Sequence, residues 1–171
     1  MNRLFNLKPL SIATIAALSL VLGYFQPAHA GAPDSRIKMA LDKAGLKYEI
    51  TSDGDFKVLV RFDDTRTQII LINSNTEKLK ETNMEIREVY SVAYQTNGNL
   101  PVEVANQLMK DSQKRKIGSW ESISINSGTS MAVFNAKVSA DLSSDNLEKV
   151  IRLVGIRADV MEKELTSADK F

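Results

Sequence analysis

The chain has 171 residues, of which 25% are charged and 43% hydrophobic, and its formal net charge is +1. This balance lacks the basic excess of a nucleic-acid-binding domain, so we expect no nucleic-acid partner. The chain has no cysteine, which excludes disulfides, thiol chemistry and cysteine-ligated metals.

Residues 1–30 have the three-part pattern of a secretory signal peptide. Arg3 and Lys8 precede an apolar run over residues 10–25, and Ala28 and Ala30 form a small-residue cleavage motif. The run is shorter than the roughly 20 apolar residues of a spanning helix, although an uncut membrane anchor is the alternative. We therefore expect cleavage after Ala30, a secreted or periplasmic protein with no stable membrane anchor, and a single mature domain over residues 31–171.

Cleavage would also remove the one histidine, His29. The mature chain would then hold neither histidine nor cysteine, and 20 basic against 21 acidic residues. This excludes Ser-His and Cys-His nucleophile pairs and the common zinc sites. Carboxylate acid–base chemistry, a Ser-Lys pair and an all-oxygen metal site stay open. Our prediction is a protein that is not an enzyme, with no cofactor and no metal site.

The first half of the mature chain predicts one helix and four strands. Asp34 or Ser35 caps a helix that ends at Gly45, and a short strand covers residues 47–51. Residues 56–62 alternate between apolar and polar side chains, which predicts a half-buried strand. Residues 67–73 include four consecutive apolar positions, which predicts a central strand covered on both faces. A polar connection over residues 74–83 leads to a long strand over residues 85–96.

The second half predicts a helix, two strands and a long final helix. The first helix begins at Pro101 and ends before Gly118. Strands over residues 119–125 and 130–140 are joined by a turn at residues 126–129. The last helix opens at residues 143–145 and has an apolar stripe that ends at Leu165. The order α-ββββ-α-ββ-α predicts an α+β domain with an antiparallel sheet of five to six strands and three helices.

The mature chain resembles the YbjN family, putative bacterial sensory-transduction regulators. The matching segments are DGDFKVLVRFDD, RTQIILI, EIREVYSVAY, LPVEVANQLMKDSQKRKIGSWE and AVFNAKVSADL, with Ala158, Asp159 and Glu162 on the last helix. The resemblance spans residues 35–166. It implies a type III secretion chaperone-like fold, a dimer and protein binding, and it carries over no catalytic residues. The chain departs from the family in its signal peptide, because many relatives look cytosolic.

Three groups of polar residues are candidates for ion binding or catalysis, and each has a plainer interpretation. Four aspartates that flank the strand 56–62 could bind calcium, but their turns explain them as well; they are Asp53, Asp55, Asp63 and Asp64. Glu85, Glu88 and Glu121 could form a carboxylate pair for hydrolysis, or could line solvated strands. Ser130 and Lys137 could form a nucleophile pair, but nothing in their spacing selects them, and serine is common throughout this chain.

An apolar patch on the sheet is the strongest candidate for a binding surface. Leu59 lies on the polar side of its strand and could join Ile69 or Leu71 from the next strand. Tyr90 and Trp120 could extend this surface, or could pack in the core. The sequence therefore predicts an exported, dimeric protein-binding module, YbjN-like, with a regulatory or chaperone-like role. The alternatives are a carboxylate-dependent hydrolase and an envelope protein that binds a small ligand or ion.

Overall fold

The computed structural model describes residues 31–62, 66–125 and 128–171. The predicted signal peptide lies outside these residues, as do Asp63, Asp64 and part of the turn predicted at 126–129. No helix in these three ranges combines the length and the hydropathy needed to cross a bilayer.

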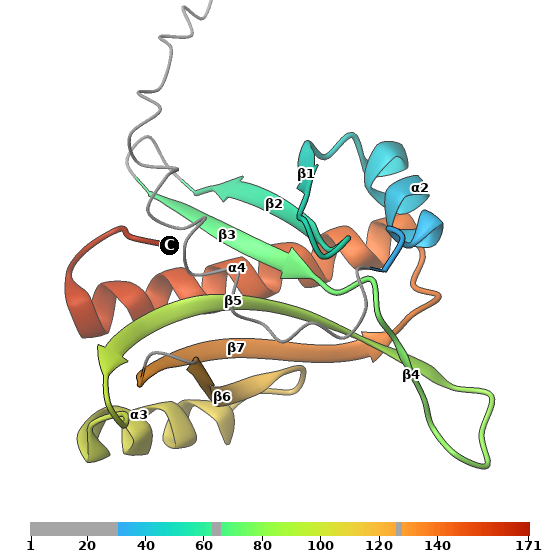
Figure 1. Cartoon of the computed structure of the whole chain (residues 1–171). Coiled ribbons are helices and arrows are strands. Elements are labelled where there is room, and N and C mark those ends of the chain that lie inside the picture. The colour runs from blue at the N-terminus through green and yellow to red at the C-terminus, as the bar shows by residue number, and fades with distance from the viewer. Residues whose placement is uncertain (1–30, 63–65, 126–127) are drawn as a thin grey trace, which may run out of the picture.

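The described chain forms one antiparallel sheet with three helices (Figure 1). The strands follow the order β1-β2-β3-β5-β7-β6, and the short β4 pairs with β5 at the side. The elements in chain order are α2 (Ser35–Ala44), β1 (Tyr48–Ile50), β2 (Phe56–Arg61), β3 (Thr67–Ile72), β4 (Glu77–Lys78), β5 (Glu85–Asn97), α3 (Val102–Ser112), β6 (Ser119–Ile125), β7 (Thr129–Ser139) and α4 (Ser144–Thr166).

The predicted α+β fold with an antiparallel sheet is confirmed, and so is the order of its main elements. Phe56, Val58 and Val60 are buried on one side of β2, as the alternation indicates. Strand β3 lies between β2 and β5 and is apolar on both sides. The sheet has seven strands because Glu77 and Lys78, within the predicted connection, pair with the start of β5.

The three helices pack against the same face of the sheet. The largest apolar cluster joins α2 and α4 to strands β2, β3, β5 and β7, and it includes Ile37, Phe56, Ile70 and Ile151. A second cluster joins α3 and α4 to β5 and β7 through Leu108 and Ala132, among others. Long helix α4 runs along the sheet behind β3 and β5 in Figure 1. We call this side the helix face.

A third apolar cluster lies on the opposite side of the sheet. Its buried members are Leu71, Tyr90, Val92, Ile125, Met131, Val133 and Phe171. They come from β3, β5, β6, β7 and the segment after α4, and none of them belongs to a described helix. We call this side the helix-free face. Side chains alternate across a strand, so long strands such as β5 and β7 supply apolar residues to both faces.

Candidate binding face

Four of the five predicted binding residues share the helix-free face. Leu59 is the cross-strand partner of Ile69, and Leu71 is the partner of Tyr90. Directly paired residues point to the same side of a sheet, and Ile69 and Leu71 lie two positions apart on one strand. The structure therefore brings Leu59, Ile69, Leu71 and Tyr90 together as the apolar-patch prediction requires.

Trp120 does not belong to this surface. Its ring contacts Phe134 edge-on, with the centroids 5.2 Å apart, and it packs against both clusters of the helix face. Its indole Nε1 donates to Asp111 Oδ2 at 2.8 Å, which ties β6 to α3. The prediction that Trp120 shares this surface is therefore wrong, and the alternative that it packs in the core is correct. Trp120 pairs with Phe134, and paired residues point to the same face, which here is the helix face.

The four residues differ in how far they are covered. Leu59 is 54% exposed, whereas Leu71 and Tyr90 are only 4% and 7% exposed. Burial, with help from nearby carboxylates, raises the pKa of the Tyr90 hydroxyl well above its usual range. The accessible apolar part of this group therefore lies at Leu59 on β2, next to the buried cluster.

Sequence reasoning missed the part of the cluster that lies nearer β6. Ile125, Met131 and Val133 join Tyr90 and Val92 on the helix-free face. The signal that could have found them is the strong apolar content of β5 and β7 on both sides. A long strand that is apolar at consecutive positions needs cover on both faces.

A polar group lies on the same face next to Tyr90. Asn135 Nδ2 donates to Glu88 Oε1 at 3.2 Å and to Glu121 Oε2 at 3.1 Å. Lys137 Nζ lies 3.0 Å from Glu121 Oε1 and 3.7 Å from Glu88 Oε1, and its ion pairing with Glu121 raises the pKa of its ammonium. Two of the three predicted glutamates therefore meet, but one ammonium and one amide hold them both. This geometry ties β5, β6 and β7 together.

A pocket of about 510 Å³ opens beside this polar group. It is lined by β4, the residues before it, and side chains from β5 and β7 that include Ile86, Glu88 and Lys137. Its lining mixes amide, carboxylate and ammonium groups with apolar ones. Such a lining offers both hydrogen-bonding and apolar contacts at this end of the face.

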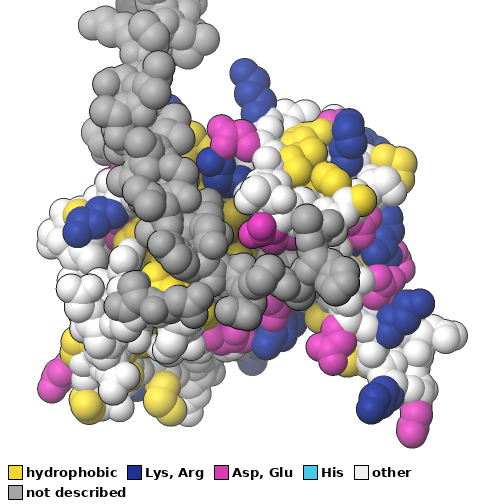
Figure 2. Space-filling model, viewed as in Figure 1, with side chains coloured by type: hydrophobic (Ala, Val, Ile, Leu, Met, Phe, Trp, Pro, Cys, Tyr) yellow, Lys and Arg dark blue, Asp and Glu magenta, His cyan; other side chains and the backbone are white. Residues whose placement is uncertain are grey.

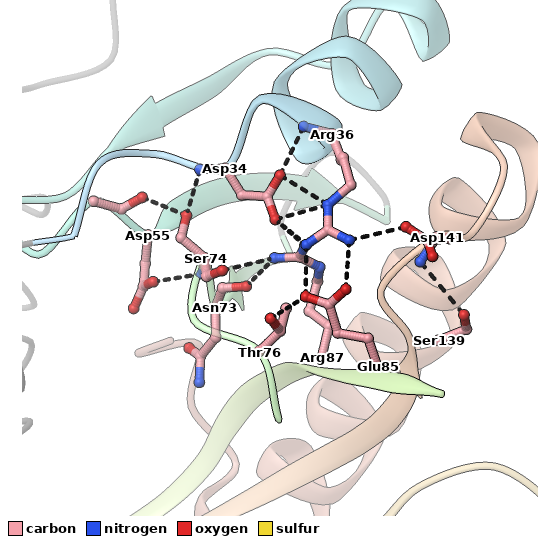
Figure 3. A network of polar contacts seen from close by, with 11 residues as sticks. Asp34, Arg36, Asp55, Asn73, Ser74, Thr76, Glu85, Arg87, Ser139 and Asp141 are labelled. Carbon is pink, nitrogen blue, oxygen red and sulfur yellow. Dashed lines mark hydrogen bonds and ion pairs between the residues drawn. The ribbon is translucent and has the colours of Figure 1, made fainter. Parts of the chain in front are cut away.

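Glu85, the third predicted glutamate, lies on the helix face, away from Glu88 and Glu121, and forms an ion pair there. Arg36 binds it with two hydrogen bonds of 2.9 Å, from Nη1 and Nη2 (Figure 3). Arg36 also binds Asp34 and Asp141, so one guanidinium joins the start of α2 to β5 and to the chain before α4. Asp34 caps α2 by accepting from the backbone nitrogen of Arg36 at 2.8 Å.

Arg87 forms the buried centre of this network (Figure 3). It is only 2% exposed, and it donates to the Asp34 carboxylate and to the backbone oxygens of Asn73 and Ser74. Burial raises the pKa of Asp34, but hydrogen bonds from Arg36 and Arg87 lower it more, so it lies well below its usual range. Hydrogen bonds from Arg36 and Thr76 lower the pKa of Glu85 to about 2. Both carboxylates therefore act as structural anions.

The remaining sequence candidates are not assembled into sites within the described residues. Asp55 accepts from the backbone nitrogen of Ser74 at 2.7 Å, which is turn chemistry. No group of three or more Asp, Glu, His or Cys in the described part of the chain is placed to hold a metal ion. Ser130 and Lys137 lie seven positions apart on β7, which separates them by about 23 Å and puts them on opposite faces.

Charges of both signs are spread over the described surface. On the side seen in Figure 2, Lys and Arg side chains alternate with Asp and Glu outside the grey atoms. In the basic run after α3, Arg115 is paired with Asp111. On this side of the molecule the charges therefore form no large patch of one sign.

Comparisons with protein-family models, with curated proteins and with solved structures found no significant match to this chain. The resemblance to the YbjN family therefore stays a prediction from the sequence.

Proposed function

We propose that this protein is an exported, non-enzymatic protein-binding module that is related to the YbjN family and binds its partner on the helix-free face. One observation carries the proposal. All three described helices lie on one side of the sheet, while the apolar cluster of Tyr90, Met131 and Val133 lies on the other. The members of this cluster are at most 8% exposed, so the part of the face that is open to a partner lies beside them, at Leu59, which is 54% exposed. An exposed apolar side chain that continues an apolar cluster favours a protein partner on this face.

The chemistry of the face defines the partner surface. Leu59 and Ile69 give an apolar contact on the β2–β3 side, and Glu88, Glu121 and Lys137 give a polar rim on the β5–β7 side. Protein interfaces commonly combine an apolar centre with a polar rim. We propose a regulatory or chaperone-like role, because both roles need a surface that holds another chain without reacting with it.

A homodimer is the first expected consequence. The mature chain, starting at Gly31, should show about twice the monomer mass by light scattering at micromolar concentration. Leu59→Asp should reduce that mass to the monomer value, because a charge in a buried interface loses its hydration. Stable interfaces typically bury roughly 1,200–2,000 Å² in total, so one central charge should have a large effect.

Met109→Asp is the matched control, because Met109 is also apolar and exposed, 71% against 54% for Leu59, but lies on α3. It should leave the dimer mass unchanged. Circular dichroism should show the same fold for both variants. A wild type that is strictly monomeric would contradict the dimer, and so would equal loss of mass in both variants.

A further inference from the structure

Strands β3 and β5 pair over only a short length. Their paired residues are Leu71 with Tyr90 and Ile72 with Val89. Towards the start of β3 the two strands separate, and β5 carries an irregularity between Val92 and Tyr94. The separation leaves one edge of β3 open inside the sheet. We call this gap between β3 and β5 the slot.

Side chains close the slot on the helix face. The amide Nε2 of Gln68 donates to the Val92 carbonyl at 2.6 Å and lies 3.0 Å from Ser91 Oγ. The Ser91 hydroxyl in turn donates to the Ile69 carbonyl at 2.6 Å. Gln68 and Ser91 are both fully buried. Two backbone carbonyls that a sheet would normally pair are therefore satisfied by side chains, which keeps the strands apart.

The segment after α4 fills the slot. Helix α4 ends at Thr166, and its C-cap Ser167, with a φ of 55°, turns the chain back towards the sheet. The backbone nitrogen of Thr67 donates to Asp169 Oδ1 at 3.2 Å, and that of Ile69 donates to the Phe171 carbonyl at 2.7 Å. The two residue numbers rise together, so residues 168–171 run alongside β3 in the same direction. Figure 1 shows this segment leaving α4 and ending next to β3.

Several of the hydrogen bonds that hold this segment are made to its backbone groups. Arg66 Nη1 donates to the Ala168 carbonyl at 2.9 Å, and Arg66 is itself held by Asp159 at 2.6 Å. The backbone nitrogen of Lys170 donates to Glu162, whose side chain is 0% exposed. Burial raises the pKa of that carboxyl, which shows the cost of placing it there. A partly exposed arginine and a buried glutamate thus bind backbone groups that any extended peptide has.

Phe171 is the one side chain of the segment that fits into the apolar cluster. Phe171 is only 8% exposed and packs into the cluster of the helix-free face with Leu71, Tyr90 and Val92. Main-chain hydrogen bonds beside a strand, together with one side-chain pocket, are the usual elements of peptide recognition by strand addition.

We propose that the slot is a peptide-binding site for an extended segment of a partner protein with an aromatic side chain, and that residues 168–171 occupy it in competition. This proposal rests on the proposed function, because it describes how a partner protein would bind at the helix-free face: as an extended segment in the slot. The attached segment acts as a built-in competitor. A tethered segment has an effective concentration in the millimolar range, so a partner must displace it or bind more tightly.

The test uses a fluorescein-labelled peptide with the sequence of residues 167–171, Ser-Ala-Asp-Lys-Phe. Fluorescence anisotropy measures its binding to the mature chain and to the double variant Asp169→Gly/Phe171→Gly, which releases the segment. The double variant should bind the peptide at least about tenfold more tightly than the wild type. A peptide with glycine in place of its phenylalanine should not bind. Lys149→Ala, a change at an exposed position on α4 outside the segment, should behave like the wild type.

Three results would overturn the proposal. The first is a folded double variant that binds the peptide no better than the wild type. The second is an unfolded double variant by circular dichroism, because the segment would then be part of the core. The third is loss of the homodimer in the double variant, which would assign the slot to a second copy's segment. Cross-linking from position 59, described below, tests the helix-free face separately from the slot, so the two failures are distinguishable.

Discussion

Replacing Arg87 with methionine is expected to lower the free energy of unfolding by about 3–5 kcal/mol. Arg87 is buried and binds Asp34 and two backbone carbonyls. Methionine keeps much of the side-chain volume. It removes one of the two arginines that bind the Asp34 carboxylate, and it removes a hydrogen-bond donor from the backbone carbonyls of Asn73 and Ser74. Urea unfolding at pH 7, followed by circular dichroism, measures the change.

Arg152→Met is the matched control for this experiment. Arg152 forms an ion pair with Glu148 at the surface of α4, with the arginine side chain 56% exposed. Exposed pairs one helical turn apart contribute only about 0.3–0.5 kcal/mol. An Arg87→Met protein as stable as the Arg152→Met protein would show that the network of Figure 3 does not hold the start of the domain to the sheet.

Gly118→Ala is expected to lower the free energy of unfolding by about 2–5 kcal/mol. Gly118 has a φ of 76°, and a Cβ at this position would lie 2.7 Å from Phe134 Cε1 and 2.9 Å from the Asn135 carbonyl. The substitution therefore adds backbone strain and a clash with the core at the start of β6. Because Asn135 lies there, the change should also disturb the polar group formed with Glu88 and Glu121.

Gly98→Ala separates the two causes. Gly98 has a similar φ of 78°, but nothing lies within 4 Å of a Cβ placed there. It should show the strain alone, about 1–2 kcal/mol. Thermal unfolding of both variants gives the comparison. Equal losses of stability would mean that the packing of Gly118 against Phe134 is not tight.

Local patterns in the sequence predict the sheet well. The alternation over residues 56–62 correctly places Phe56 and Val58 in the core and leaves Leu59 on the other side. The consecutive apolar residues of β3 correctly indicate a central strand. The two-residue strand β4 was missed because its pairing partners on β5 define it, while its own composition is that of a connection.

The apolar residues of the helix-free face could be predicted from the sequence only in part. Leu59, Ile69, Leu71 and Tyr90 follow from strand periodicity, which fixes the face of each residue once neighbouring strands are known. Trp120 was misplaced because a lone aromatic residue at the start of a strand gives no indication of register. Its position became clear only from its pairing with Phe134.

The slot lay beyond sequence reasoning altogether. Gln68 and Glu162 are fully buried, although both residue types are normally exposed. Both belong to segments that resemble the YbjN family, but their local sequence does not indicate that they are buried or which groups they bind. Their partners lie on other elements, 24 residues away for the Val92 carbonyl that Gln68 binds. The partners of these side chains are defined only once α4 and residues 168–171 are packed against β3.

Site-specific photo-cross-linking in the producing cell tests the central claim most directly. A photoreactive phenylalanine derivative at position 59 samples the helix-free face. The same derivative at position 109 samples α3, where the native side chain is at least as exposed as Leu59. The envelope fraction is irradiated, and adducts are resolved by gel electrophoresis and mass spectrometry. We expect discrete protein adducts from position 59 and only background from position 109. Adducts that form equally from both positions, or only from position 109, would contradict protein binding by the helix-free face.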